Sequence, residues 1–205
     1  EVTKTKYHRV KINNTLTWKN HITIIKSKAV KSISIIYRMK FFVPRSVLMS
    51  LYHALVEPYL QYCNIIWAGH RTSALMDLFL CQKRLMRIIT NSSRLSHSAP
   101  LFKQLSILPV YDINNLQVGC FMYSAVNRLL PQCFSSMFVT NSTLHSYSTR
   151  RHNDIHQTQF RLNITKFSIR VYRALLWNSL DSEIKCLPTL SSFKNRYKQN
   201  LIASL

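Results

Sequence analysis

The chain has 205 residues, and its 28 Lys and Arg against seven Asp and Glu give a net charge of +21. Such a charge makes a polyanion the expected partner, whereas so few scattered carboxylates argue against metal-assisted phosphate chemistry by this chain alone. Because the chain has only two glycines, a Walker A loop and a GxGxxG dinucleotide-binding motif are both excluded.

Composition also predicts the fold class. Hydrophobic residues make up 47% of the chain, which is enough for a sizeable core. Scarce Gly together with abundant Leu, Ile, Lys and Arg favours helices. We therefore expect a mainly α protein, a helical bundle with a short N-terminal strand and a smaller mixed C-terminal region.

The first predicted element is a short strand over residues 5–13, where apolar and polar residues alternate weakly. A helix is predicted over 21–42 because apolar residues recur there at helical spacing, namely Ile22, Ile25, Ala29, Ile33 and Ile36. Lys28, Lys31 and Arg38 project from the opposite face. Solvation and contact with phosphates compete as explanations of that charged face.

A second helix is predicted to begin at Pro44 and to end or kink at Pro58, with a short aromatic helix after it. A third helix is predicted over 73–90. Gln82 lies on its apolar stripe, so this amide should be buried and hydrogen-bonded. Three basic residues flank the stripe near the helix C-terminus: Lys83, Arg84 and Arg87. They suit phosphate binding, but the helix dipole alone also favours cations at that end.

After residue 97 the sequence predicts a helix over 98–107, an apolar helix over 113–130 and a loop with one short strand over 131–166. The segment 168–180 is apolar again, and a last amphipathic helix follows it. Asp112 should cap the apolar helix, and Ser191 or Ser192 should cap the last one. A domain boundary is expected near 131–150, where Ser, Thr, Asn and His are abundant.

Few residues are arranged for chemistry. His152 and His156 have the i, i+4 spacing of metal-binding histidines, but their polar context favours a loop, and no glutamate accompanies them as a base. Five dispersed cysteines without a CxxC pair indicate reduced thiols. Arg150 could bind a phosphate or end a loop.

Since no signal peptide and no apolar run of membrane-spanning length is visible, we expect an intracellular protein, nuclear or cytoplasmic.

Several short runs follow one another in a distinctive order. LTWKNHI occupies residues 16–22, LYHALVEPYLQYCNIIW occupies 51–67, and Gln82-Lys83-Arg84 is followed by Arg87. Shorter runs of the same ordered set lie at 100–102, 108–109, 131–134, Thr149-Arg150, Ser168-Ile169, 176–180 and 193–194. The residues that carry these motifs are Trp18, His21, Tyr52, Pro58, Tyr62, Trp67, Gln82, Trp177, Asn178 and Phe193. Together the runs resemble the part after the palm in reverse transcriptases of non-LTR retrotransposons (LINE-type, jockey-like).

The resemblance implies the end of a palm at 1–20, a helical thumb at 21–130 and a C-terminal region at 131–205 of an RNA-directed DNA polymerase. The family's catalytic aspartates lie in a Phe/Tyr-x-Asp-Asp motif. This sequence has no adjacent Asp pair, so we assign no catalytic residue and expect no activity from the chain alone. No cofactor is expected in this chain, because Mg²⁺ would bind only at the palm. The chain begins at Glu1 without an initiator methionine, and we expect a fragment.

In this family the thumb holds the template–primer by its backbone, so the expected partners are RNA, DNA and the upstream polymerase domain. Phosphate contacts supply affinity without reading sequence. The residues expected to make them are Lys28, Lys31, Arg38, Lys83, Arg84, Arg87 and Arg150. We expect the cluster at 83–87 to matter more than the cluster on the last helix, which consists of Lys194, Arg196 and Lys198.

The chain departs from the family at three places. His8-Arg9 stands where Leu-Gly is usual, Asn13 stands where Asp is common, and Arg173 stands near a frequent Gly. An Arg in place of a Gly that needs positive φ would strain the backbone.

Two other functions compete with the family role. The amphipathic, Lys-bearing helix at 21–42 allows a basic helical module that binds an anionic membrane surface or an acidic protein. Burial of its apolar stripe against other helices would oppose the membrane role, so no membrane partner is expected. An autonomous hydrolase or nuclease is disfavoured, because no acid cluster or nucleophile–base pair is visible.

Overall fold

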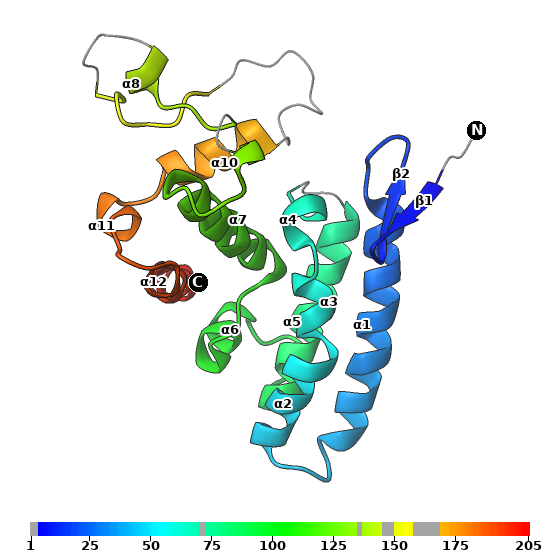
Figure 1. The fold of residues 1–205 in the computed structure, drawn as a ribbon. Helices are drawn as coiled ribbons and strands as arrows, with labels where there is room; N and C mark the ends of the chain where they lie inside the picture. Colours follow the sequence, from blue (N-terminus) through cyan, green and yellow to red (C-terminus); the bar gives the residue numbers. More distant parts are fainter. Residues whose placement is uncertain (1–3, 70–72, 135–136, 145–149, 158–168) are drawn as a thin grey trace. The chain divides into compact units, whose positions relative to one another are not determined.

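The computed structural model describes residues 4–69, 73–134, 137–144, 150–157 and 169–205. These residues form a mainly helical protein with a two-stranded sheet near the N-terminus, as the composition predicted (Figure 1). The chain divides into two compact units, one of residues 1–114 with 201–205 and the other of residues 115–200. The domains predicted from the resemblance stay a prediction. Among the described residues, no helix combines the length and apolar character needed to cross a membrane.

The N-terminal sheet is an antiparallel hairpin of β1 (Lys4–Tyr7) and β2 (Val10–Asn13), in which Tyr7 pairs with Val10. The sequence predicted a single strand over this stretch, which was wrong in detail. The two strands are joined by His8-Arg9, and both residues have positive φ, 41° and 69°. Such a tight turn normally carries Asn or Gly. The turn was missed because His-Arg gives no turn signal.

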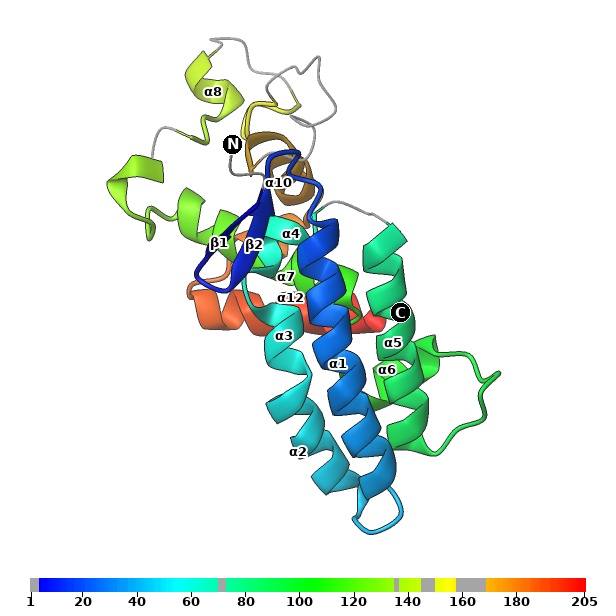
Figure 2. The ribbon, with the colours of Figure 1, turned by 90° about the vertical axis from the view of Figure 1, so that its right-hand side faces the viewer.

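The other regular elements described in the first unit are helices. Its helices are α1 (Lys19–Met39), α2 (Arg45–Leu55), α3 (Glu57–Gln61), α4 (Asn64–Trp67), α5 (Ser73–Thr90) and α6 (Ala99–Leu105). Helix α1 packs against both α5 and the α2–α3 pair, and α2 also contacts α5. Figures 1 and 2 show these helices side by side, with the hairpin beside the N-terminal half of α1. The predicted helices at 21–42 and 73–90 are therefore confirmed, and they are neighbours.

The apolar stripes of α1 and α5 meet in the core of this unit. The predicted α1 stripe is buried in full, and on α5 the buried residues are Leu75, Leu78, Gln82, Leu85, Met86, Ile88 and Ile89. On α2 only Leu48 and Tyr52 are buried, whereas Val47 is exposed. Pro58 lies in the first turn of α3, so it begins a helix as well as ending one.

The second unit contains most of α7 (Val110–Val126), a 3₁₀ turn η1 (Gln132–Phe134), α8 (Asn141–Leu144), α10 (Ile169–Asn178), α11 (Ser182–Lys185) and most of α12 (Leu190–Ala203). Two predicted caps were wrong. Asp112 lies inside the first turn of α7, because the N–H of Ile113 already bonds to the Pro109 carbonyl. Thr189 replaces Ser191 or Ser192 as the cap of α12, since its hydroxyl accepts the N–H of Ser192 at 3.1 Å.

Aromatic rings build the core of the second unit. Phe193 is fully buried, and its ring centroid lies 4.8 Å from that of Tyr123, 5.9 Å from Trp177 and 5.7 Å from Tyr197. Arg173 lies in α10 and is buried, with its guanidinium 5.0 Å from the ring centre of Phe121. Its backbone is helical, so the strain expected for an Arg at a positive φ does not arise. Burial lowers the pKa of Arg173 to about 10.

Candidate nucleic-acid interface

An open groove runs between the C-terminal halves of α1 and α5, and we call it the α1–α5 groove. It consists of two adjoining depressions that share Tyr37 and Arg84, and the larger has a volume of about 610 Å³. Its cationic residues are Arg38, Lys40, Arg84, Arg87 and Arg94. None of the described residues that line it is acidic. The groove is therefore a concentrated site of positive charge.

Helical periodicity places these cations on the rims. The core stripe of α1 leaves Val30, Ser34 and Tyr37 on the edge that faces α5, and Arg38 follows on the solvent side. On α5, Arg84 and Arg87 are three residues apart and so lie on one edge of the helix. Packing of the two apolar stripes thus brings together basic residues that are far apart in the sequence.

At the C-terminal ends of α1 and α5, polar contacts link the groove to the loop that follows α5. Arg87 donates from Nε to the carbonyl of Ser96 at 2.9 Å, which fixes the loop that carries Arg94. Lys40 Nζ reaches Asn91 Oδ1 at 3.5 Å in the same region. Arg87 therefore positions the loop as well as adding charge, whereas Arg38 and Arg84 are exposed.

Only part of the predicted binding set gathers here. Arg38, Arg84 and Arg87 line the groove, and Lys31 is exposed two turns before Arg38. Two predicted lysines face other neighbours. Lys28 lies 5.3 Å from the ring centre of Tyr59 in α3, and Lys83 lies 4.4 Å from that of Phe79. Arg150 is exposed in the second unit. The binding role of all seven residues stays a prediction.

Sequence reasoning missed three residues of the groove. Tyr37 and Lys40 follow the edge of α1 at positions i and i+3, a spacing that could have revealed them once that edge was known. Arg94 lies in the loop before α6, where no periodic pattern marks it.

The first group of motif residues forms a structural cluster under the hairpin. His21 is buried, with its ring edge toward Trp67 at 5.8 Å, and its Nδ1 accepts the N–H of Lys11 at 3.3 Å. Trp67 donates its indole N–H to the Tyr62 carbonyl at 2.9 Å, and Tyr62 donates its hydroxyl to the His8 carbonyl at 2.6 Å. Burial, followed by the nearby charge of Lys28, lowers the pKa of His21. His21 and Tyr62 therefore attach the hairpin to the helices through its backbone groups at Lys11 and His8.

The remaining motif residues are structural as well. Trp18 is buried at the start of α1, and Trp177 and Phe193 belong to the aromatic core of the second unit. Asn178 makes two hydrogen bonds to the backbone of Ile155, one to its N–H at 3.0 Å and one from its own amide to the carbonyl at 2.9 Å. The motif residues Thr149 and Ser168 lie outside the described residues.

Gln82 behaves as predicted: it is buried and hydrogen-bonded to Leu108 and Val110. Its neighbour Tyr52 is also fully buried, and burial raises the pKa of that phenol far above its usual value.

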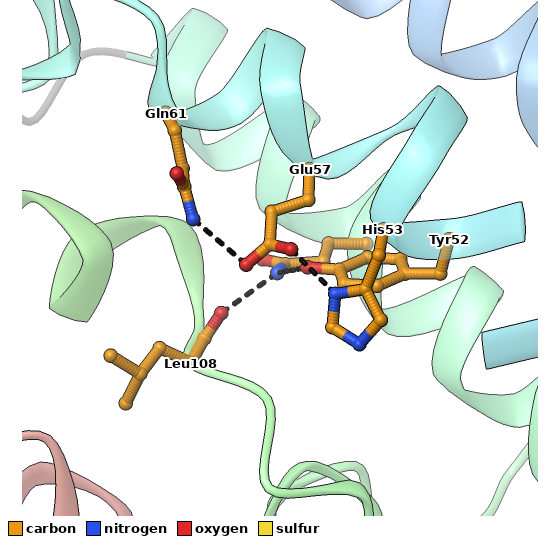
Figure 3. Close-up of polar contacts among 6 residues, drawn as sticks. Tyr52, His53, Glu57, Gln61 and Leu108 are labelled. Carbon is orange, nitrogen blue, oxygen red and sulfur yellow. Dashed lines mark hydrogen bonds and ion pairs between the residues drawn. The ribbon is translucent and has the colours of Figure 1, made fainter. Parts of the chain in front are cut away.

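Three hydrogen-bonded polar side chains, His53, Glu57 and Gln61, lie beside Tyr52 and Leu108 (Figure 3). Glu57 bridges His53 Nδ1 and the Gln61 amide, so one carboxylate orients an exposed imidazole.

Metal ligation has little support in the described part of the chain. No three His, Cys, Asp or Glu side chains come together there as a set of metal ligands would. His152 lies in a turn and His156 follows the isolated bridge between Thr140 and Ile155, so neither is on a helix. His156 Nδ1 contacts Asn141 Oδ1 at 3.2 Å.

Comparisons with known protein families, with curated proteins and with solved structures found no match for this chain. Function must therefore be argued from the groove and from the order of the motifs.

Proposed function

We propose that this chain is the thumb-like and C-terminal part of a reverse transcriptase from a LINE-type retrotransposon, and that the α1–α5 groove binds the phosphate backbone of an RNA–DNA template–primer. One observation carries the binding role: five cations from two helices and a loop line a single groove in which no described lining residue is acidic. The ordered motifs support the family.

The dimensions and chemistry of the groove suit a phosphate chain. Its α1 wall runs from Val30 to Lys40, about 15 Å of helix at 1.5 Å per residue. Each strand of a duplex carries one phosphate per about 3.4 Å of helix axis, so a wall of this length lying parallel to that axis would span roughly four phosphates of one strand. Four of the five cations are arginines, whose planar guanidinium groups can donate two hydrogen bonds to one phosphate.

Polymerisation itself would need another segment. The adjacent aspartates of the family's palm are absent from this sequence, so the palm and its Mg²⁺ would come from the upstream polymerase domain. This chain would supply affinity for the nucleic acid, which backbone contacts provide without sequence preference.

A titration at several salt concentrations tests the binding role. Fluorescence anisotropy of a labelled RNA–DNA heteroduplex should give an affinity that falls steeply as salt rises. The double variant Arg38→Gln/Arg84→Gln should bind more weakly and with a shallower salt dependence, because both residues are exposed and line the groove. Lys194→Gln/Lys198→Gln on α12 removes the same charge and should have a smaller effect.

Two outcomes would refute the proposed binding role. One is an affinity that does not depend on salt, and the other is an equal loss in the two double variants. Co-sedimentation with anionic vesicles addresses the competing membrane role. Strong vesicle binding with no binding of the heteroduplex would favour that alternative.

A further inference from the structure

Three exposed aromatic side chains lie at the end of α1 and in the turn to α2, and we call them the aromatic tip. Tyr37, Phe41 and Phe42 are 46%, 68% and 81% exposed. Solvent-exposed rings clustered in this way mark an interaction site more often than ordinary surface. The buried stripe of α1 ends at Ile36, before these three rings.

The aromatic tip continues the basic groove. Tyr37 lines the α1–α5 groove itself, and Phe41 lines the next depression together with Lys40 and Arg45. The ammonium of Lys40 lies 5.0 Å from the ring centre of Tyr37 and 4.9 Å from that of Phe41. Cations and aromatic faces are therefore interleaved at one end of the groove.

Backbone contacts fix the turn that carries Phe41 and Phe42. The N–H groups of Phe42 and Val43 both donate to the carbonyl of Met39, at 2.9 and 3.1 Å. Pro44 then begins α2 with a fixed φ of −67°. The rings of Tyr37 and Phe41 meet edge to face at 6.0 Å. A turn whose backbone is already fixed loses less conformational freedom on binding.

We propose that the aromatic tip stacks the unpaired bases of a single strand whose phosphates continue into the α1–α5 groove. This inference rests on the proposed function and names the form of nucleic acid bound at this end. Proteins that bind single strands combine a cationic groove along the backbone with aromatic rings on which bases stack. A groove with cations on both walls fits a chain-like polyanion better than the flat surface of a bilayer.

The test compares an intact single strand with an abasic strand of the same length, which keeps the phosphates and lacks the bases. Phe41→Ala/Phe42→Ala in the full chain should weaken binding of the intact strand about 5- to 150-fold, the range for loss of stacking on one base. Binding of the abasic strand and its salt dependence should change little. Val47→Ala, an exposed apolar residue on α2, serves as the matched control.

Each result bears on a different claim. Equal losses on the intact and abasic strands, or no loss on either, would overturn the stacking proposal while leaving the groove's role intact. A loss confined to anionic vesicles would overturn it in favour of membrane insertion. Conversely, Arg38→Gln/Arg84→Gln without effect on the two single strands or on the heteroduplex would refute the proposed function itself. Circular dichroism of each variant checks that the helices remain folded.

Discussion

The side-chain oxygen of Gln82 in α5 accepts the backbone N–H of Val110, the first residue of α7, at 2.9 Å. The same amide donates to the carbonyl of Leu108 at 2.9 Å, and its nitrogen lies 3.4 Å from the hydroxyl of Tyr52. One buried side chain thus satisfies the N–H of Val110 and the carbonyl of Leu108 where α7 starts. This amide fixes the path of the chain between α6 and α7.

Gln82→Leu should lower the free energy of unfolding by about 2–4 kcal/mol. The leucine fills a similar volume but leaves the N–H of Val110 and the carbonyl of Leu108 without their side-chain partner, and each such buried group costs about 1–3 kcal/mol. Urea unfolding followed by circular dichroism measures the change. Gln61→Leu is the control, because this exposed amide bonds to Glu57 on the surface, and its replacement should cost less than about 0.5 kcal/mol.

Arg9→Gly should stabilise the protein by about 0.5–1 kcal/mol. Arg9 has a φ of 69°, and an L-residue in the left-handed region costs about 1–2 kcal/mol, which Gly avoids while losing some backbone entropy. The control is Lys11→Gly, which removes the same charge from a regular strand position in β2 and should destabilise. Thermal unfolding distinguishes the two, and a loss of stability in both variants would contradict a strained turn.

Gly119→Ala should destabilise the second unit by about 1–2 kcal/mol. A Cβ at this position would meet Tyr197 Cε1 at 2.6 Å and Phe193 Cζ at 3.4 Å, so rings in the core would have to shift. Overpacking costs about 1–3 kcal/mol, and the better helix propensity of Ala returns up to about 1 kcal/mol of this loss.

Gly69→Ala is the control for this substitution, because a Cβ at Gly69 meets no heavy atom within 4 Å. Its unfolding midpoint in urea should stay close to that of the unaltered chain. Equal midpoints for the two alanine variants would show that α7 and α12 do not approach so closely at Gly119.

Acidification should destabilise the packing of the hairpin through His21. Burial lowers the pKa of this imidazole in the folded protein, so the unfolded chain binds more protons near its ordinary value of about 6.5. The stability that the neutral ring contributes is complete above pH 6.5 and is lost as the pH falls through the lowered pKa.

Unfolding measured between pH 7.5 and about pH 5 tests this contribution. His21→Gln should flatten the dependence of stability on pH, whereas His53→Gln, at an exposed histidine paired with Glu57, should keep most of it. An unchanged slope in His21→Gln would assign the acid effect to other histidines.

Long helices with strict apolar stripes could be predicted from the sequence. The prediction for α5 matched the structure over Ser73–Thr90, and Gln82 was correctly expected to be buried because it was the polar residue on that stripe. The hairpin could not be predicted, because its turn residues carry no Gly or Asn. The caps of α7 and α12 were misplaced because Pro109 and Thr189 begin these helices earlier.

The candidate site was only partly visible in the sequence. Arg38 and Arg84 line one groove because α1 packs beside α5, and no local pattern gives that pairing. Conversely, Lys83 and Arg84 are adjacent in sequence, but neighbours on a helix point about 100° apart. Lys83 lies over Phe79, away from the groove, so a basic cluster in sequence is divided between two faces.

Single substitutions at Arg84 and Lys83 should therefore show whether nucleic-acid binding depends on a cation in the groove or only on the net charge of the protein. Arg84→Gln should reduce the slope of log affinity against log salt by about 0.9, the value for one phosphate contact on a duplex, and should weaken binding of an RNA–DNA heteroduplex. Lys83→Gln removes the same charge one residue earlier and should change the slope by less than half as much. Anisotropy titrations at four salt concentrations measure both slopes. An equal change in the two variants would mean that general charge, rather than the α1–α5 groove, attracts the nucleic acid.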